Sequence, residues 1–233
     1  MGNIINTSWV IRTKNEGEHI GEVLEMLQKQ TRQDFEIIIV DSGSTDKTLE
    51  IVKKFPTELI KINPEEFNYS YSLNVGIKKS KCRYIGILSG HSVPITKTFY
   101  ADGIKFFSNP NVAAISGHYV NSRFRFAAKT IFLNQEQHFI HDMTNTNSLI
   151  RRELWSIYPF NEKLALGCED YDWALEMLAR GYDVVKAPSF STIYYRVNNK
   201  PSYWKMKPIW NKICREIDKK KRPSKSFSKI IDD

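Results

Sequence analysis

Apolar residues follow two alternating patterns through the first half of the chain. Mainly apolar runs at residues 8–11, 37–40 and 83–88 predict buried strands, because short runs rich in β-branched residues suit strands covered on both faces. Between the first two runs, one face of a helix is indicated by the spacing of Ile20, Val23, Leu24 and Leu27. Alternating strands and helices predict an α/β fold, with a Rossmann-like, mostly parallel sheet flanked by helices.

The regular pattern continues past residue 57 and weakens in the second half. Further elements are expected in this order: a strand at 58–62, helices at 71–79 and 98–107, a strand at 112–115, a helix at 171–180 and a strand at 183–188. Gly181 is placed to end the last helix. Residues 118–147 are rich in Phe, Asn, His and Arg without a clean period, which indicates a region that shapes a substrate site as much as it packs.

The second strand runs directly into a polar turn. Asp41 stands where the β-branched run ends, and Ser44, Thr45 and Asp46 offer capping oxygens to a helix that carries Leu49, Val52 and Phe55. Open α/β sheets bind ligands beyond the carboxyl ends of their strands. The turn therefore predicts a ligand site, and a plain strand-turn-helix connection is the alternative.

Length and charge divide the chain into a body and a tail. The 233 residues suit one domain at 1–199 with a basic, aromatic helical tail at 200–233. The tail holds 11 Lys and Arg against 4 Asp and Glu, whereas the body holds 23 against 22. Such a tail suits anionic lipid or nucleic acid, and Tyr203, Trp204 and Trp210 favour the membrane surface. A solvated helix with a frayed end is the alternative.

Segments that would fix a compartment are missing from the sequence. No apolar run approaches the roughly 20 residues that span a bilayer, and no secretory segment opens the chain. We therefore expect a cytoplasmic protein, peripheral at the inner face of the membrane through its tail. Cys82, Cys168 and Cys214 form no CxxC pair, so free thiols are expected rather than a zinc knot or a disulfide framework.

Read together, several blocks resemble the nucleotide-sugar-dependent glycosyltransferases of family 2, which have the GT-A fold. The blocks are VIRTKNE at 10–16, VDSGSTD at 40–46, FN at 67–68 with LNVG at 73–76, and GCEDYDWA at 167–174 with RGYDV at 180–184. Each block alone is weak, but their order and spacing over residues 5–196 make the likeness specific. The resemblance implies sugar transfer with inversion.

The resemblance also implies a set of donor-binding residues. Asp41 and Ser42 match the pair that contacts the base, and the facing loop and a later helix contribute Thr13, Asn15, Glu16 and Asn74. Carboxylates and hydroxyls at a strand end can accept hydrogen bonds from a base or ribose. For Glu16, a charge favoured by a helix N-terminus is the alternative. Leu73 stands where one branch of the family has an arginine, so one phosphate contact is missing.

Two adjacent acids match the family's catalytic position. An inverting transfer needs a base that removes the proton of the acceptor hydroxyl. The resemblance gives that role to Asp170, while Glu169 orients the acceptor or the helix end. Acids are also common in a first helical turn because they favour the helix dipole, so capping is the alternative.

The metal motif of the family is altered here. Ser89, Gly90 and His91 follow the strand that ends near residue 88, so His91 takes the place of the metal-binding aspartate. Manganese accepts imidazole more readily than magnesium does, so His91 is a metal ligand only for such an ion. The second metal ligand of the family, often a histidine, is expected near Arg196, where this chain has no histidine. Our hypothesis is transfer with little or no metal, with His91 and Arg196 contacting the diphosphate.

Other functions and partners stay open at this stage. His138, His141 and Asp142 suit acceptor contact or surface better than a metal site. The main rival function is a GT-A domain that binds a nucleotide sugar or glycan without catalysis. A nucleotidyltransferase is disfavoured because this chain lacks the glycine-rich phosphate loop of such enzymes. Nucleic-acid binding would depend on the tail alone. The resemblance favours a UDP-sugar donor, and the basic tail suits a glycan or lipid-linked acceptor.

Overall fold

A computed structural model describes residues 5–120, 131–133, 143–195 and 201–221. Its strands are β1 (Thr7–Thr13), β2 (Phe35–Asp41), β3 (Glu58–Lys61), β4 (Tyr84–Ser89), β5 (Ser92–Pro94), β6 (Val112–Ser116), β7 (Tyr119–Val120), β8 (Ile131–Leu133), β9 (Asn147–Arg151), β10 (Asp183–Lys186) and β11 (Thr192–Tyr194). Its α-helices are α1 (Ile20–Gln28), α2 (Thr48–Val52), α3 (Tyr69–Lys79), α4 (Phe99–Ile104), α5 (Arg152–Ile157), α6 (Glu169–Ala179) and α7 (Pro201–Lys221). Short 3-10 helices span Pro64–Glu66, Lys105–Ser108 and Pro188–Phe190.

The main sheet has eight strands in the order β3-β2-β1-β4-β9-β6-β10-β8. The first four strands are parallel, as is the pair of β6 and β10. Strand β9 runs antiparallel between β4 and β6, and β8 runs antiparallel to β10. A smaller sheet joins β5, β11 and β7. The expected mostly parallel α/β sheet is confirmed, with an antiparallel strand inserted near its middle.

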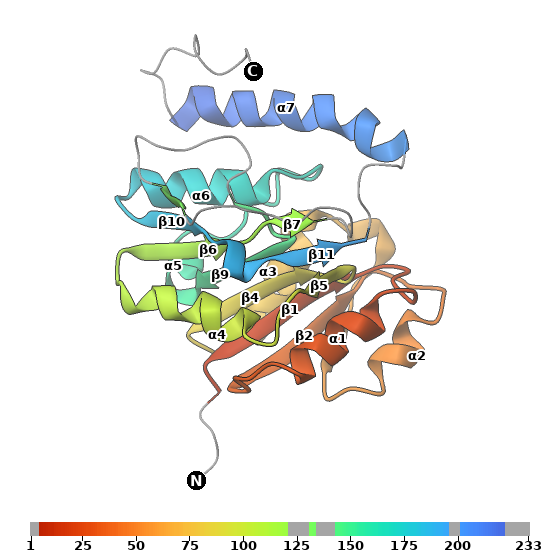
Figure 1. Cartoon of the computed structure of the whole chain (residues 1–233). Coiled ribbons are helices and arrows are strands. Elements are labelled where there is room, and N and C mark those ends of the chain that lie inside the picture. Colours follow the sequence, from red (N-terminus) through yellow and green to blue (C-terminus); the bar gives the residue numbers. More distant parts are fainter. Residues whose placement is uncertain (1–4, 121–130, 134–142, 196–200, 222–233) are drawn as a thin grey trace.

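Helices cover both faces of the main sheet, and this explains the apolar runs (Figure 1). On β2, Ile38 and Val40 belong to a core shared with α3, α5 and α6. Their neighbours Ile37 and Ile39 belong to the opposite core, shared with α1, α2 and α4. Successive residues of a strand point to opposite faces, so a strand buried on both sides needs an unbroken apolar sequence.

Element ends differ from the expected ones where capping decides them. Helix α2 ends at Val52, before Phe55, and Asp46 accepts a hydrogen bond from the Thr48 amide in its first turn at 2.9 Å. Helix α6 ends at Ala179, and Gly181 follows with φ +87°, a left-handed conformation that glycine adopts without strain. The expected termination at Gly181 is confirmed. The N-cap of α2 is Lys47 instead of Ser44, Thr45 or Asp46, although Asp46 still accepts the Thr48 amide bond from one residue before the cap.

The tail begins with a long helix that packs onto the body. Helix α7 lies along α6, on the side away from the sheet (Figure 1). Cys214, Ile217 and Asp218 are buried in this contact. The hydroxyl of Tyr171 in α6 donates to Asp218 at 2.6 Å. None of the helices in the described part of the chain is long and apolar enough to cross a membrane.

Candidate active site

Three strands bring polar side chains to one edge of the main sheet. Thr13 pairs with Asp41 in the parallel ladder of β1 and β2, and Arg12 pairs with Ser89 in the ladder of β1 and β4. The carboxyl ends of these strands therefore lie side by side. The Ser89 amide also donates a hydrogen bond to the Thr146 carbonyl at 3.1 Å, which brings the segment before β9 to the same edge.

Asp41 organises the turn after β2. Its carboxylate accepts hydrogen bonds from the Gly43 and Ser44 amides, both at 3.0 Å, and from the Thr13 hydroxyl at 3.0 Å. The Asp41 side chain is buried, and the Ser42 hydroxyl donates to the Thr13 carbonyl at 3.3 Å. These bonds hold Asp41, Ser42 and Thr13 to one another. Their contact with a base or ribose stays a prediction.

The loop after β1 is tied to the loop after β2. Asn15 has φ +54°, a left-handed conformation that asparagine tolerates, and its side-chain oxygen accepts from the Thr45 amide at 2.8 Å. The Glu16 amide donates to the Thr48 hydroxyl at 2.7 Å. The two loops thus form one scaffold at the edge, as a shared ligand site requires.

Asn74 is held inside the protein by its own amide group. The side-chain nitrogen donates to the Phe160 carbonyl at 2.8 Å and to Glu162 at 2.9 Å, and the oxygen accepts from the Trp155 indole at 3.0 Å. These bonds tie α3 to α5 and to the segment that follows α5. The contact of Asn74 with the donor stays a prediction. The side chain also stabilises the packing of α3 against α5.

Glu16 and His91 form a buried pair beside β4. The Nδ1 atom of His91 lies 2.9 Å from a Glu16 carboxylate oxygen. Gly90 fits between them and β1, because a Cβ on Gly90 would lie 2.8 Å from the Glu16 Cγ atom. A carboxylate bonded to one imidazole nitrogen fixes the ring and its tautomer. Glu16 therefore sets how the other nitrogen of His91 is presented.

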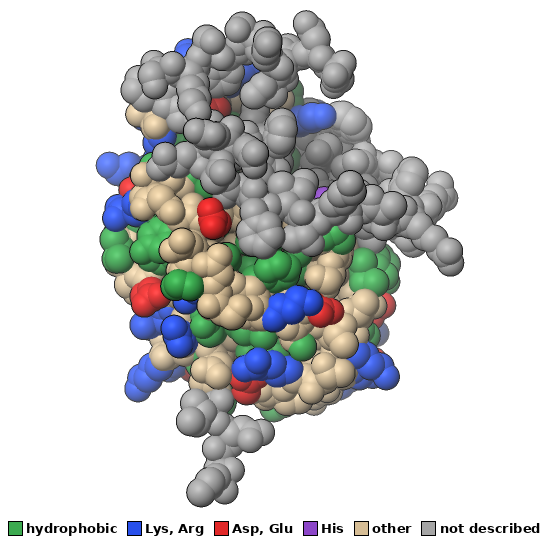
Figure 2. Space-filling view, turned by 60° about the vertical axis from the view of Figure 1, so that its left-hand side comes forward, with side chains coloured by type: hydrophobic (Ala, Val, Ile, Leu, Met, Phe, Trp, Pro, Cys, Tyr) green, Lys and Arg blue, Asp and Glu red, His purple; other side chains and the backbone are tan. Residues whose placement is uncertain are grey.

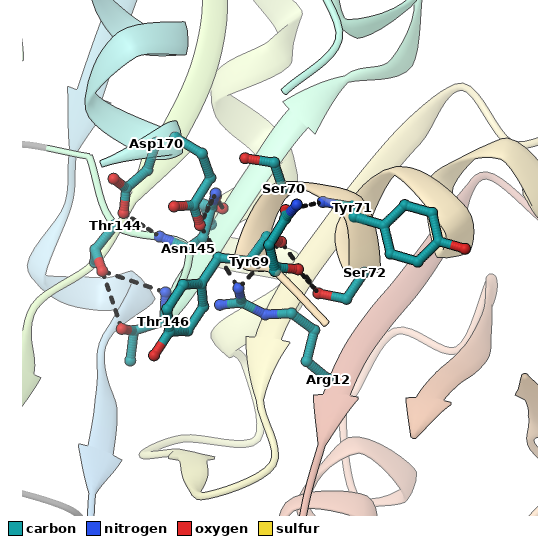
Figure 3. A network of polar contacts seen from close by, with 12 residues as sticks. Arg12, Tyr69, Ser70, Tyr71, Ser72, Thr144, Asn145, Thr146 and Asp170 are labelled. Atoms are coloured by element: carbon teal, nitrogen blue, oxygen red, sulfur yellow. Dashed lines mark hydrogen bonds and ion pairs between the residues drawn. The ribbon is translucent and has the colours of Figure 1, made fainter. Parts of the chain in front are cut away.

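The acidic pair lies at the start of α6. Figure 3 shows Asp170 beside Asn145. Asp170 accepts the Asn145 backbone amide at 3.0 Å, and the Asn145 side chain donates to Glu169 at 3.3 Å. Arg12 lies 3.6 Å from Glu169, and its guanidinium sits 5.0 Å from the Tyr69 ring centre. The segment before β9 and the end of β1 therefore position both acids.

Burial shifts the proton affinity of both acids. Burial, and then the charge of Asp170, raises the pKa of Glu169 to about 7, although Arg12 acts against this shift. Burial also raises the pKa of Asp170, against the lowering effect of the Asn145 and Tyr171 amides. A carboxylate whose pKa is raised toward neutrality is a stronger base than an exposed one. The pair can therefore accept a proton from a hydroxyl group.

Three residues of this cluster were absent from the predicted site. Arg12 and Tyr69 fall within or beside blocks of the family pattern, and a basic residue at the end of a buried strand was the available signal for Arg12. Asn145 falls in the irregular segment, where no periodic pattern marks which side chains meet the site.

Several predicted residues lie outside the described residues, namely Arg196, His138, His141 and Asp142. Within the described ranges, no group of three or more His, Cys, Asp and Glu side chains is arranged to hold a metal ion. His91 contacts Glu16 through Nδ1, an arrangement that is also common for a histidine whose other nitrogen binds a metal. The described residues therefore form no complete metal site by themselves, and His91 is a single candidate ligand among them.

Sequence comparison gives a family for the chain. The model of the family described as Glycosyl transferase family 2 matches residues 8–157. A dolichyl N-acetyl-alpha-D-glucosaminyl phosphate 3-beta-D-2,3-diacetamido-2,3-dideoxy-beta-D-glucuronosyltransferase from Methanococcus voltae is 25% identical over 222 residues, covering 81% of this chain and 66% of the relative. The O-antigen chain rhamnosyltransferase WbaN from Salmonella anatum is 30% identical over 110 residues, covering 46% of this chain and 35% of the relative. The chain thus spans less than two thirds of these relatives.

Solved structures share the fold at low sequence identity. The mannosyltransferase PcManGT from Pyrobaculum calidifontis, solved with GDP-Man and Mn2+, has a TM-score of 0.74 and 18% identity, covering 95% of this chain and 65% of its own. Staphylococcus aureus TarS residues 1–349, solved with UDP, has a TM-score of 0.68 and 18% identity, covering 86% and 63%. With the family match over more than half of its length, the chain belongs to glycosyl transferase family 2.

Proposed function

We propose that this protein moves a sugar from a nucleotide-sugar donor to an acceptor hydroxyl with inversion, and that Asp170 is the general base. The observation that carries the proposal is the place of Asp170. Its carboxylate stands at the start of α6, is fixed by the Asn145 amide and has a raised pKa. The paired loops after β1 and β2 lie at the same sheet edge and are suited to the nucleoside end of the donor.

In this mechanism the two acids have different tasks. As the acceptor oxygen bonds to the anomeric carbon, its proton passes to Asp170 and the bond from that carbon to the diphosphate breaks. Glu169, held by Arg12 and Asn145, keeps the helix end and the acceptor oriented. The nucleoside diphosphate leaves with the electrons of the broken bond.

The negative charge of the leaving diphosphate requires neutralisation. We propose that His91, held at Nδ1 by Glu16, donates from Nε2 to the diphosphate as an imidazolium, with Arg196 as a further cation. The described residues form no complete metal site, and the mechanism that we propose has no step through a metal ion. The mannosyltransferase PcManGT was solved with Mn2+. If an ion arrives together with the donor diphosphate, we expect it to be manganese.

A metal-chelation experiment with two variants tests the role of His91. The wild-type protein is expected to keep its transfer rate in EDTA, because the imidazole supplies the donor. His91→Asp, which restores an aspartate at this place, is expected to be inactive in EDTA and to recover with added Mn2+. His91→Asn is the matched control, because it lacks the added charge and is expected to stay weak in both conditions. Full manganese dependence of the wild-type protein would overturn the metal-free mechanism.

The donor and acceptor classes are also proposals. We favour a UDP-sugar, since TarS was solved with UDP and with UDP-GlcNAc, although PcManGT was solved with GDP-Man. A glycan or lipid-linked acceptor agrees with the dolichyl phosphate named for the Methanococcus voltae relative.

A donor panel tests the proposed activity. UDP-, GDP- and dTDP-sugars are each added to the protein, and thermal unfolding and release of the nucleoside diphosphate are measured. A true donor is expected to raise the unfolding temperature by mass action and to release its nucleoside diphosphate slowly without acceptor. Stabilisation without any release would favour the rival function, a domain that only binds nucleotide sugars or glycans. The altered motif at Ser89, Gly90 and His91 is the observation that supports this rival.

A further inference from the structure

Helix α7 has an inner face that anchors it to the body. Cys214 and Ile217 are buried in the core shared with α6. The Trp210 indole donates to the Leu166 carbonyl at 2.6 Å, and the Cys214 sulfur lies 3.2 Å from the Cys168 sulfur, just before the catalytic pair. The middle of α7 therefore lies against the start of α6.

The opposite side of α7 carries a row of cations. Lys205, Lys212 and Lys219 are exposed at seven-residue intervals, which is close to two helical turns, so they share one line along the helix. Arg215 and Lys220 flank this line and are also exposed. We call these five residues the basic stripe. From Lys205 to Lys220 the stripe extends about 23 Å along α7, so it is long enough to meet an extended surface.

The basic stripe is nearly uniform in charge. Glu216 is the one acid on this side of the helix within residues 205–221, because Asp218 is buried toward α6. The body is different: on the face shown in Figure 2, cationic and anionic side chains are mixed over the surface. A uniform row of cations on an otherwise balanced protein points to an anionic partner.

We propose that the basic stripe docks the protein on an anionic lipid bilayer, with α7 lying flat on the headgroups. Two apolar residues, Pro208 and Ile209, are exposed among the cations, and Ile209 is 39% exposed. Apolar side chains between lysines suit the boundary between headgroups and acyl chains, whereas the phosphates of a nucleic acid offer them no partner. The lipid surface is therefore favoured over nucleic acid.

One sequence-based argument for the membrane changes here. Trp210 was expected to face the membrane, but its indole is bonded to Leu166 on the inner side. The side chains of Tyr203 and Trp204 lie outside the described residues. The contact is therefore carried by charge, with Ile209 as the apolar contribution.

Docking through α7 has a consequence for the acceptor, and this step rests on the proposed function. The inner side of α7 touches the turn that leads into Asp170, so a bilayer on the outer side lies one helix away from the proposed base. An acceptor with a lipid anchor would then be held near the base while its anchor stays in the bilayer. The acceptor class that follows is a lipid-linked glycan.

Vesicle sedimentation tests the docking without requiring activity. Wild-type protein is mixed with vesicles of phosphatidylcholine alone or with about 30% phosphatidylserine, at low salt and at about 0.5 M salt. The stripe variant replaces Lys205, Lys212 and Lys219 by Glu. The matched control replaces Lys53, Lys78 and Lys97, which are exposed on the body, by Glu, so the net charge changes equally. Circular dichroism and thermal unfolding check that each variant is folded.

The wild-type protein and the matched control are expected to bind the anionic vesicles and to release them at high salt. The stripe variant is expected to bind at least about tenfold more weakly. Equal binding by the stripe variant, or wild-type binding that ignores salt and lipid charge, would overturn the proposal. Binding to a labelled single-stranded RNA with none to vesicles would also overturn it, in favour of nucleic acid. Because sedimentation measures no transfer, an inactive protein could still pass this test.

Discussion

At the scale of single residues, the site depends on how neighbours set the charge of Glu169 and Asp170. Arg12 and the Asn145 side chain act on Glu169, whereas backbone amides act on Asp170. Adjacent carboxylates in a buried place disfavour double ionisation, so the protons of the pair are shared and titrate together. The protonation of the proposed base is thereby set by its neighbours in the fold.

This coupling predicts the pH dependence of transfer. Asp170 accepts a proton only when it is ionised, so the rate is expected to fall as the pH drops through the raised pKa of Asp170, which titrates together with Glu169. Glu169→Gln removes the neighbouring charge and is expected to move this fall to lower pH. The measurement is kcat/KM against pH for both proteins. An unmoved profile in the variant would contradict the coupling.

The same shift predicts a trend in stability. The folded-state pKa of Glu169 is above its unfolded value, so its contribution is complete below about 4.5 and is lost as the pH rises through about 7. The wild-type free energy of unfolding is therefore expected to fall more steeply than that of Glu169→Gln between these pH values. Urea titrations at several pH values measure both slopes, and parallel slopes would count against a buried, raised Glu169.

Individual site residues were predictable only where a motif marks them. Asp41 follows a buried strand, and Glu169 and Asp170 open a helix, so their neighbours in sequence point to their places. The bond between Glu16 and His91 joins residues 75 positions apart, and Asn145 reaches the site from an irregular segment. Such contacts depend on tertiary packing, which local sequence patterns do not predict.

At the scale of elements, α7 acts as a clamp on α6. Lys221 lies 2.9 Å from Asp172 and 3.2 Å from Glu176, and the Tyr158 hydroxyl donates to Asp172 at 2.9 Å. Asp172 is buried, so removal of its cationic partner leaves a poorly compensated charge. The first turn of α6 carries the proposed base, and this clamp steadies the helix behind it.

A pair of lysine variants tests the clamp. Lys221→Ala is expected to lower the free energy of unfolding by roughly 2 kcal/mol, because Asp172 stays buried without its ion pair. Lys220→Ala is the neighbouring control; its side chain is exposed, and its effect is expected to be within about 0.5 kcal/mol. Urea unfolding gives both values. Equal losses in the two variants would mean that the ion pair does not hold α7.

Elements were predictable where the period was regular and long enough. Helix α1 and strands β1, β2 and β4 match the apolar spacing, because both faces of the sheet are covered. Strand β9 was not expected, although its five residues are buried, since the surrounding segment shows no clean period. Its antiparallel course between β4 and β6 depends on long-range pairing rather than local sequence.

At the scale of the whole molecule, the main sheet and α6 position the candidate site, and α7 places the basic stripe on the outside. The sheet holds the loops of β1 and β2 at one edge, the insertion of β9 brings Asn145 to that edge, and α6 adds the acids. Helix α7 closes the far side of α6 and turns its basic stripe outward. The proposed donor-binding residues and the proposed base thus lie on separate elements, so donor binding and catalysis are expected to be separable by mutation.

The separation of binding from catalysis is the most direct test of the proposed function. Asp170→Asn keeps the shape of the side chain and removes the base, and Asp102→Asn, on the exposed side of α4, is the control. We predict that Asp170→Asn binds the donor with a Kd within about threefold of wild type while kcat falls by roughly 100-fold to 10,000-fold. Asp102→Asn should match wild type in both. A kcat for Asp170→Asn close to that of wild type, with unchanged donor binding, would contradict the assignment of Asp170 as the base.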